Sequence, residues 1–424
     1  MSRIQTVRGT RDILPGEVEA WQRVEATARE VFSLYGFHEI RTPVFEATEL
    51  FARGVGSSTD IVRKEMYTFT SGEDSLTLRP EMTASVVRSY IQHGLSRVPG
   101  AERLFYIGPM FRRERPQKGR QRQFHQIGVE VFGSEDPYTD AETIEMVLAY
   151  LGRLGIGGLG LVVNSVGCRE CRPGYRQALR AWLEPVVASL CEDCRRRYEE
   201  NPMRVFDCKV EEDRRRLAEA PTSLDHLCAV CRGHFDSFRA HLGRLGLAYR
   251  VDPRLVRGLD YYVRTAFEVV AEQGLGSQNS LMGGGRYDGL VRELGGPEVA
   301  GFGWALGIER LMLLLGAAAE EGAAPRIDAR SDVFIVHLGE AARDLSTTIA
   351  RDLRARNLSV RLDPRAAKIA AQMKRADREG ARFVLILGDD EIGKGVYQLK
   401  NMKTGEQQPV RAGALDELWA RIRS

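Results

Sequence analysis

Long apolar runs are missing from this sequence. No stretch approaches the ~18 consecutive apolar residues of a membrane-spanning helix. The N-terminus, MSRIQTVRGTRD, also lacks the apolar segment of a secretion signal. We therefore expect a cytoplasmic protein with no membrane partner.

Cysteine is missing from most of the chain. All seven cysteines lie between Cys168 and Cys231, and six of them form three CxxC pairs. An odd count in a chain without a secretion signal argues against a disulfide framework and favours metal ligands or free thiols.

A strong net charge is absent as well. The 61 Lys and Arg nearly balance the 58 Asp and Glu, which leaves +3. Residues 331–424 hold 17 Lys and Arg and 13 Asp and Glu, so this part carries +4. A nucleic-acid partner would therefore contact the C-terminal part and local basic loops rather than respond to a global field.

What remains is the composition of a globular protein, and 424 residues are enough for two to three domains. The pattern predicts an amphipathic helix from Val18 to Tyr35. A strand that carries Pro43 follows, and the proline places this strand at an edge, a bulge or an interface. Charged, helical residues from 168 to about 247 are typical of an insertion. A loop is expected at Gly283–Gly285, and GFGWALGIERLMLLL is expected to open a long apolar helix. Residues 317–332 indicate a linker, and beyond it a βαβαβ pattern predicts a compact three-layer α/β domain.

The most distinctive stretch is FRRERPQKGRQRQFHQIGVEVFG, residues 111–133. Six cations surround one acid, Glu114, and an alternating run then places Gln126, Gly128 and Glu130 on one face. We predict strand, basic loop, strand, which could present guanidinium groups to a polyphosphate. A solvated surface loop is the alternative. Upstream, Glu81 and Thr83 follow Pro80, and on spacing alone they indicate ordinary helix-start chemistry.

The cysteine pairs suit tetrahedral zinc, since two CxxC pairs make a full ligand set. A helix over about residues 176–190 would separate Cys168 and Cys171 from the second pair by ~20 Å, at ~1.5 Å per residue. We therefore predict one structural Zn²⁺, with reduced and partly buried thiols as the alternative. The predicted ligands are Cys191, Cys194, Cys228 and Cys231.

Five motifs in one order carry a resemblance: TLRPEMTA, the basic hairpin, RGLDYYVRTAFEV, GGGRYDGL and GFGWALGIERL. Together they closely resemble the histidyl-tRNA synthetase family, which belongs to the class II aminoacyl-tRNA synthetases. RGLDYY and GGGRYD resemble the two peptides that distinguish the histidine enzymes from other class II members.

The resemblance implies an α/β fold with an α+β catalytic core, an antiparallel sheet flanked by helices, over residues 1–325. The helical, cysteine-bearing insertion at 168–247 lies within it, and residues 326–424 would form a three-layer α/β anticodon-binding domain. It also implies a homodimer built around the first long helix and the Pro43 strand. The implied partners are ATP with Mg²⁺, L-histidine and tRNA(His).

The resemblance assigns phosphate binding to arginines, which are planar bidentate donors. Arg112 matches the residue that grips the ATP α-phosphate, and Arg310 the one that holds the γ-phosphate. Arg120 matches a loop residue that contacts phosphate or tRNA, and Glu114 would face adenine or orient the loop. Arg257 matches the arginine that contacts both the histidine carboxylate and the α-phosphate, so Arg257 and Arg112 are the implied catalytic residues.

The remaining matches concern histidine. Glu130 and Tyr262 match the pair that satisfies both imidazole nitrogens, as burial requires. Glu81, Thr83 and Gln126 match the residues that hold the α-amino group. Tyr261 and Tyr287 would line the pocket or pack in the core.

Three other functions compete with this one. A non-catalytic paralogue, like the regulatory subunit of ATP phosphoribosyltransferase, would tend to lose the catalytic arginines and the anticodon domain. The other two are a class II synthetase for another amino acid and an RNA-binding protein with a silenced site.

Overall fold

The computed structural model describes residues 3–56, 59–97, 100–275, 279–320, 331–363 and 368–423. The chain divides into two compact units, Met1–Arg326 and Ile327–Ser424. In the described ranges, no helix is both long enough and apolar enough to cross a membrane. The predicted linker at 317–332 lies mostly outside these ranges, and its first residues continue a helix that ends at Glu320.

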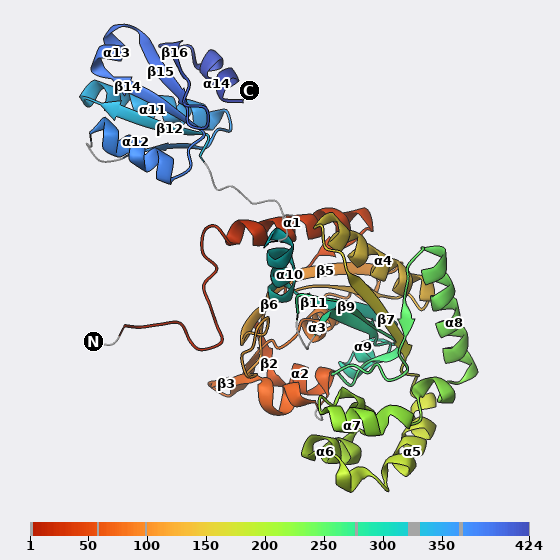
Figure 1. Cartoon of the computed structure of the whole chain (residues 1–424). Helices are drawn as coiled ribbons and strands as arrows, with labels where there is room; N and C mark the ends of the chain where they lie inside the picture. The colour runs from red at the N-terminus through yellow and green to blue at the C-terminus, as the bar shows by residue number, and fades with distance from the viewer. Residues whose placement is uncertain are drawn as a thin grey trace. The chain divides into compact units, whose positions relative to one another are not determined.

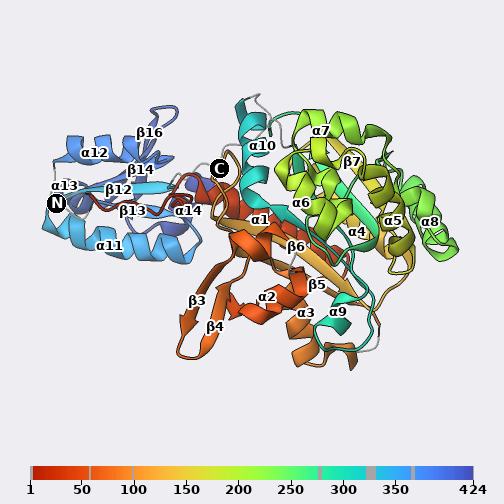
Figure 2. The ribbon, with the colours of Figure 1, turned by 90° about the horizontal axis from the view of Figure 1, so that it is seen from below.

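An eight-stranded sheet forms the centre of the first unit (Figures 1 and 2). Its order is β1-β5-β6-β11-β10-β9-β7-β8, and the pairs are antiparallel except β1–β5 and β7–β8 at the two edges. The strands are β1 (His38–Glu39), β5 (Glu102–Phe111), β6 (Gln123–Phe132), β7 (Leu159–Ser165), β8 (Arg250–Val251), β9 (Val263–Ala271), β10 (Ser280–Arg286) and β11 (Gly301–Gly307). The predicted antiparallel sheet flanked by helices is confirmed.

Four helices cover one face of this sheet and contribute to its main core. They are α1 (Val18–Leu34), α4 (Pro137–Arg153), α8 (Ala229–Arg244) and α10 (Ile308–Glu320). A smaller apolar cluster lies on the opposite face, where α3 (Thr83–Gln92) and α9 (Leu290–Glu293) pack. Alternation along β6 puts Ile127 and Val129 in the main core, so Gln126 and Glu130 face the other way.

A separate three-stranded sheet lies beside this body, and Figure 2 shows β3 and β4 as a projecting hairpin. It consists of β2 (Phe45–Ala47), β3 (Tyr67–Ser71) and β4 (Asp74–Leu78), and α2 (Thr48–Val55) follows β2. Pro43 falls between β1 and β2, so the predicted single strand is two short ones. This break is expected because proline cannot donate to a strand ladder.

The cysteine-bearing segment contains three short helices that lie together in Figure 1. These are α5 (Cys171–Leu183), α6 (Glu192–Glu200) and α7 (Glu211–Arg216). The segment's last helix, α8, instead packs into the main core through Phe235, Phe238 and Leu242. The cysteine segment is therefore anchored to the sheet by its final helix.

The second unit is a five-stranded sheet of order β13-β12-β14-β15-β16 with helices on both faces. Its elements are β12 (Val333–Leu338), α11 (Glu340–Ala355), β13 (Val360–Leu362), α12 (Ile369–Arg378), β14 (Phe383–Gly388), α13 (Asp389–Gly393), β15 (Val396–Asn401), β16 (Gln407–Arg411) and α14 (Leu415–Arg423). The predicted three layers are present. The pattern missed β16, an edge strand that contains Pro409.

Candidate functional site

A cavity of about 370 Å³ opens on the face of the sheet opposite the main core. Its walls come from strands β6, β9, β10 and β11, from the loops around residues 112–120 and 256–262, and from the first turn of α10. Ten of the twelve predicted ATP- and histidine-site residues line it, and the other two, Glu130 and Tyr287, lie buried beside it. The structure thus brings together residues that are up to 229 positions apart, from Glu81 to Arg310.

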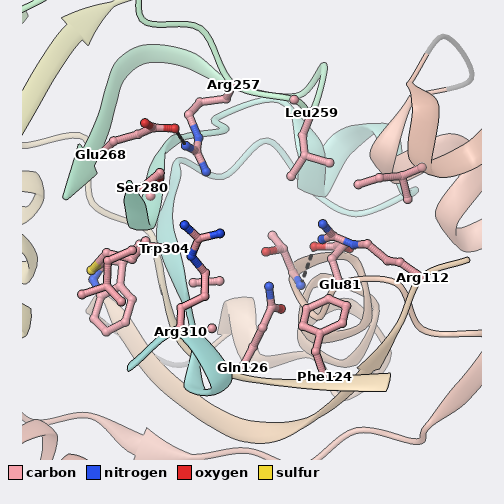
Figure 3. Close-up of a pocket in the computed structure, with 18 of the residues that line it drawn as sticks. Glu81, Arg112, Phe124, Gln126, Arg257, Leu259, Glu268, Ser280, Trp304 and Arg310 are labelled. Carbon is pink, nitrogen blue, oxygen red and sulfur yellow. Dashed lines mark hydrogen bonds and ion pairs between the residues drawn. The ribbon is translucent and has the colours of Figure 1, made fainter. Parts of the chain in front are cut away.

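Three arginines from different elements point into this cavity (Figure 3). Arg112 follows β5, where its Nε donates to the Pro80 carbonyl at 2.8 Å and its guanidinium lies 5.1 Å above the Phe124 ring. Arg310 enters from the first turn of α10. Burial and repulsion from Arg120 lower the pKa of Arg310. Cations held this close together favour a polyanionic ligand.

The predicted basic hairpin is confirmed as β5, a loop and β6. Within the loop, Arg120 donates to the carboxylate of Glu114 at 2.9 Å, and both side chains line the cavity. This ion pair fixes Arg120 beside the other cations instead of leaving it as a solvated surface charge.

Arg257 stands on the loop between β8 and β9. Its guanidinium forms an ion pair with Glu268 of β9 and lies 5.9 Å from the ring of Tyr262. Burial lowers the pKa of Arg257, but the attractions to Glu268, Tyr262, Tyr261 and Asp207 together outweigh burial and leave this pKa raised. Gly283 of β10 makes room for this guanidinium, because a Cβ there would overlap it.

The polar floor of the cavity is built around the start of α3. Glu81 accepts hydrogen bonds from the backbone N–H groups of Thr83, at 2.8 Å, and Ala84, at 2.9 Å. Its carboxylate therefore caps the helix, as the spacing predicted, and it lines the cavity as well. Burial raises the pKa of Glu81, an effect that these hydrogen bonds partly offset.

Glu130 lies beneath this floor and is fully buried. It accepts hydrogen bonds from the Thr83 hydroxyl, at 2.7 Å, and from the Tyr287 hydroxyl. Burial raises the pKa of Glu130 to about 8, although the hydrogen bonds from Tyr287 and Thr83 act in the opposite direction. At neutral pH this carboxyl group is therefore mostly protonated.

Two further residues belong to the site and were not predicted. Tyr106 lines the cavity opposite Gly128, where a Cβ would overlap the tyrosine hydroxyl. Glu268 pairs with Arg257. The sequence feature that could have indicated Tyr106 is Gly128, a glycine on the face of β6 that carries Gln126 and Glu130. Glu268 lies on the face of β9 that lines the cavity.

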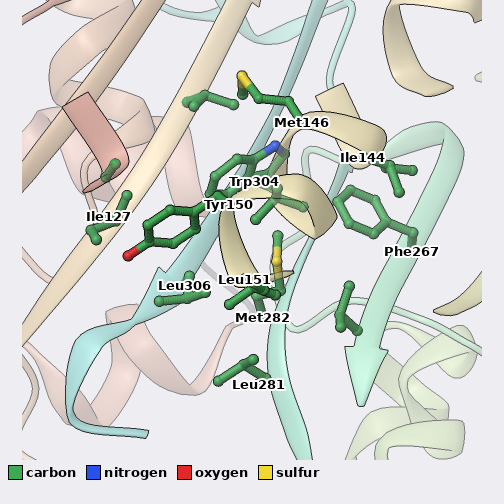
Figure 4. Packing of buried hydrophobic residues seen from close by; sticks show 14 of the residues in the cluster. Ile127, Ile144, Met146, Tyr150, Leu151, Phe267, Leu281, Met282, Trp304 and Leu306 are labelled. Carbon is green, nitrogen blue, oxygen red and sulfur yellow. The ribbon is translucent and has the colours of Figure 1, made fainter. Parts of the chain in front are cut away.

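The back wall is shared with the core. Trp304 of β11 lines the cavity and belongs to the main core cluster with Ile127, Tyr150 and Phe267 (Figure 4). The sequence GFGWALG was expected to open a helix, and the structure corrects this to strand β11. Gly303 of β11 lets the Glu130 carboxylate lie against the strand, because a Cβ at position 303 would overlap this carboxylate. The expected loop at Gly283–Gly285 is likewise a strand, β10.

The cysteines do not form the predicted group of Cys191, Cys194, Cys228 and Cys231. One cluster consists of Cys168, Cys171, Cys228 and Cys231, and the other of Cys191, Cys194, Cys208 and Asp213. Helix α5 does separate the first two CxxC pairs, as expected. The third pair was misplaced because α8 begins beside the end of β7, which brings Cys228 back to Cys168.

A family model described as histidyl-tRNA synthetase matches residues 9–311, and one described as an anticodon binding domain matches residues 332–424. The histidine–tRNA ligase of Geobacter sulfurreducens is 51% identical over 96% of this chain and 97% of its own length. That of Solibacter usitatus is 51% identical over 99% of both chains. The crystal structure of apo Staphylococcus aureus histidyl-tRNA synthetase, at 40% identity, superposes with a TM-score of 0.83 and covers 100% of each chain.

The antiparallel sheet, the arginine-lined cavity on its open face and these matches define an aminoacyl-tRNA synthetase of class II. Its two matched segments cover both compact units. The chain belongs to the histidyl-tRNA synthetase family, whose curated members ligate histidine to tRNA, and it is an enzyme of that kind.

Proposed function

We propose that this cavity activates L-histidine with ATP and then transfers histidine to the 3′ end of tRNA(His). The observation that carries the proposal is the convergence of Arg112, Arg257 and Arg310 on one cavity whose floor holds two buried carboxyl groups. The cations suit a triphosphate, and the floor suits a small polar amino acid.

In this proposal the arginines hold ATP. Arg112 binds the α-phosphate and Arg310 the γ-phosphate, while Arg120 and Glu114 support the phosphate side of the loop. The stacking of Arg112 on Phe124 and its hydrogen bond to Pro80 support this role, because they fix the guanidinium before the substrate arrives. Preorganised donors stabilise charge as it develops at the α-phosphorus.

Histidine lies between Arg257 and the floor. A histidine carboxylate oxygen attacks the α-phosphorus, the bond to the β-phosphate oxygen breaks, and pyrophosphate leaves with its electron pair. A carboxylate is already nucleophilic, so no general base is needed and positioning is the main task. Arg257 performs it by contacting both anions, and its pairing with Glu268 keeps the guanidinium in place.

The floor recognises the rest of the amino acid. Glu81, Thr83 and Gln126 hold the α-amino group, and all three line the cavity. Glu130 and Tyr262 bind the imidazole, with Tyr261 and Tyr287 beside them. Because the Thr83 hydroxyl also donates to Glu130, the two subsites are linked by one hydrogen bond.

ATP would bring Mg²⁺ to the site. This ion is usually bound through one or two carboxylates together with substrate phosphates and waters. The lining offers the carboxylates of Glu268 and Glu114, each paired with an arginine. These two carboxylates fit an ion that is carried by the nucleotide. When bound, the ion would neutralise phosphate charge.

The remaining assignments concern the whole enzyme. Residues 1–325 form the catalytic domain, with the insertion at 168–247, and residues 326–424 bind the anticodon of tRNA(His). The enzyme works in the cytoplasm as a homodimer. Exposed apolar side chains on β2 and β3 support the dimer, because an exposed apolar patch is typical of a protein interface. In this patch Phe45 and Phe69 pack ring to ring with their centroids 6.4 Å apart. Sedimentation at one chain per particle would refute the dimer.

Histidine-dependent exchange of pyrophosphate into ATP tests the activity. The wild type should catalyse it with histidine and with no other amino acid. The Arg257→Ala variant should lose about 10²–10³-fold in rate, the usual effect of removing one preorganised donor. Arg250→Ala is the matched control, because Arg250 is a solvent-exposed arginine on β8 that pairs only with Asp252 among the described residues. Absence of exchange in the wild type, or full exchange in Arg257→Ala, would refute the assignment.

A further inference from the structure

All seven cysteines of this chain are gathered in two clusters inside the insertion. None of them is in a disulfide. In the first cluster, the Sγ atom of Cys168 lies 3.6 Å from that of Cys171 and 4.0 Å from that of Cys228. Zn–S bonds of about 2.3 Å in a tetrahedron require sulfurs about 3.8 Å apart, whereas a disulfide requires about 2.05 Å. The sulfurs are therefore spaced for a shared metal.

Backbone donors complete this arrangement. The N–H of Cys228 donates to the Sγ of Cys171 at 3.1 Å, and the N–H of Cys231 donates to the Sγ of Cys228 at 3.5 Å. Hydrogen bonds of this kind orient metal ligands and disperse the negative charge of thiolates.

The second cluster has the same spacing with a different fourth ligand. The Sγ atoms of Cys191 and Cys208 are 3.8 Å apart, and an oxygen of Asp213 lies 3.3 Å from the Sγ of Cys208. Asp213 is only 3% exposed, and its carboxylate accepts a hydrogen bond from the backbone N–H of Cys191 at 3.0 Å. No Lys or Arg of the described ranges forms an ion pair with it. The hydrogen bonds from Cys191 and Cys208 hold the carboxylate beside the sulfurs, where a metal ion would supply the cation that a buried carboxylate favours.

We propose that the insertion binds two structural Zn²⁺ ions per chain, one at each cluster. The first has four cysteine ligands, and the second has three cysteines with Asp213. Each cysteine that binds zinc releases its thiol proton to solvent, and no oxidant or reductant is needed. Both sites have all four tetrahedral positions filled by protein, which is the arrangement of structural zinc.

The two sites connect the insertion to the wall of the cavity. At the first, Cys171 begins α5, and the next residue, Arg172, donates to the backbone carbonyl of Tyr262. At the second, Cys208 directly follows Asp207, which lines the cavity. The metals thus fix two segments that end at the proposed substrate site, although the zinc proposal does not depend on that function.

Metal analysis of the full chain tests the proposal. The protein is purified under reducing conditions without chelators, and its zinc is measured by mass spectrometry. We expect two zinc ions per chain. Zinc content of one or none in the wild type overturns the proposal, and this measurement does not depend on whether any variant folds.

Two variants and a control assign the ions. Cys171→Ser and Cys208→Ser should each retain one zinc, so the ion that remains reports that the insertion is still folded. Arg232→Ala, an exposed change one residue after Cys231, should retain two. Cobalt substituted into the wild type should give tetrahedral absorption with thiolate charge-transfer bands, weakened in each cysteine variant. If either variant keeps both ions, that cluster is not a zinc site.

Discussion

At the scale of single residues, Glu130 is a fully buried carboxyl group. An unperturbed glutamate has a pKa of about 4.3, whereas burial raises that of Glu130 to about 8. The folded protein therefore holds a proton that the unfolded chain releases earlier. The contribution of this group to stability is complete below about pH 4.3 and is lost as the pH rises towards 8.

The Glu130→Gln variant should remove this loss. Between pH 5 and pH 9, its free energy of unfolding without ligands should fall less steeply than that of the wild type, because no proton is released at this position. Urea unfolding at several pH values measures the slope. Glu135→Gln is the matched control, since Glu135 is an exposed glutamate soon after β6 and its variant should keep the wild-type slope. Equal slopes in Glu130→Gln and the wild type would contradict the raised pKa.

At the scale of elements, substitutions at two neighbouring glycines of β10 should affect different properties, one the activity and the other the stability. The three atoms nearest to a Cβ at Gly283 all belong to the guanidinium group of Arg257, which can move, whereas a Cβ at Gly284 would overlap the backbone of Gly303 and Trp304. Gly283→Ala should therefore slow pyrophosphate exchange by displacing Arg257, with little change in the melting temperature. Gly284→Ala should lose about 1–3 kcal/mol of stability, as overpacking usually does. Pyrophosphate-exchange assays and thermal unfolding of both variants measure these effects. If Gly283→Ala lowered the melting temperature and Gly284→Ala left it unchanged, the expected contacts of the two glycines would be wrong.

The same strands show what could be read from the sequence. Period-two alternation in β6 predicted that Gln126 and Glu130 share one face, and the structure places both opposite Ile127 and Val129 of the main core. Strands β10 and β11 were missed because glycine, which is poor in strands, fills the positions where Arg257 and Glu130 approach the backbone. The cysteine grouping failed for a different reason. Local spacing shows which cysteines form pairs, but only the path of α8 shows that Cys228 returns to Cys168.

At the scale of the whole molecule, the two units bury separate cores. The apolar clusters of the first unit contain residues below 320, and those of the second contain only residues from 333 onward. Every residue that lines the cavity also lies in the first unit. Amino-acid activation and tRNA binding should therefore be separable, since no described residue of the second unit belongs to the core clusters or to the cavity lining of the first.

A chain of residues 1–326 should keep histidine-dependent pyrophosphate exchange close to the wild-type rate. Its KM for tRNA in aminoacylation should rise on the order of tenfold or more, because each tenfold corresponds to about 1.4 kcal/mol of lost binding. The same truncation with Arg257→Ala is the control and should lose exchange. Loss of exchange from a truncated chain that still melts cooperatively would show that the second unit contributes to the catalytic site.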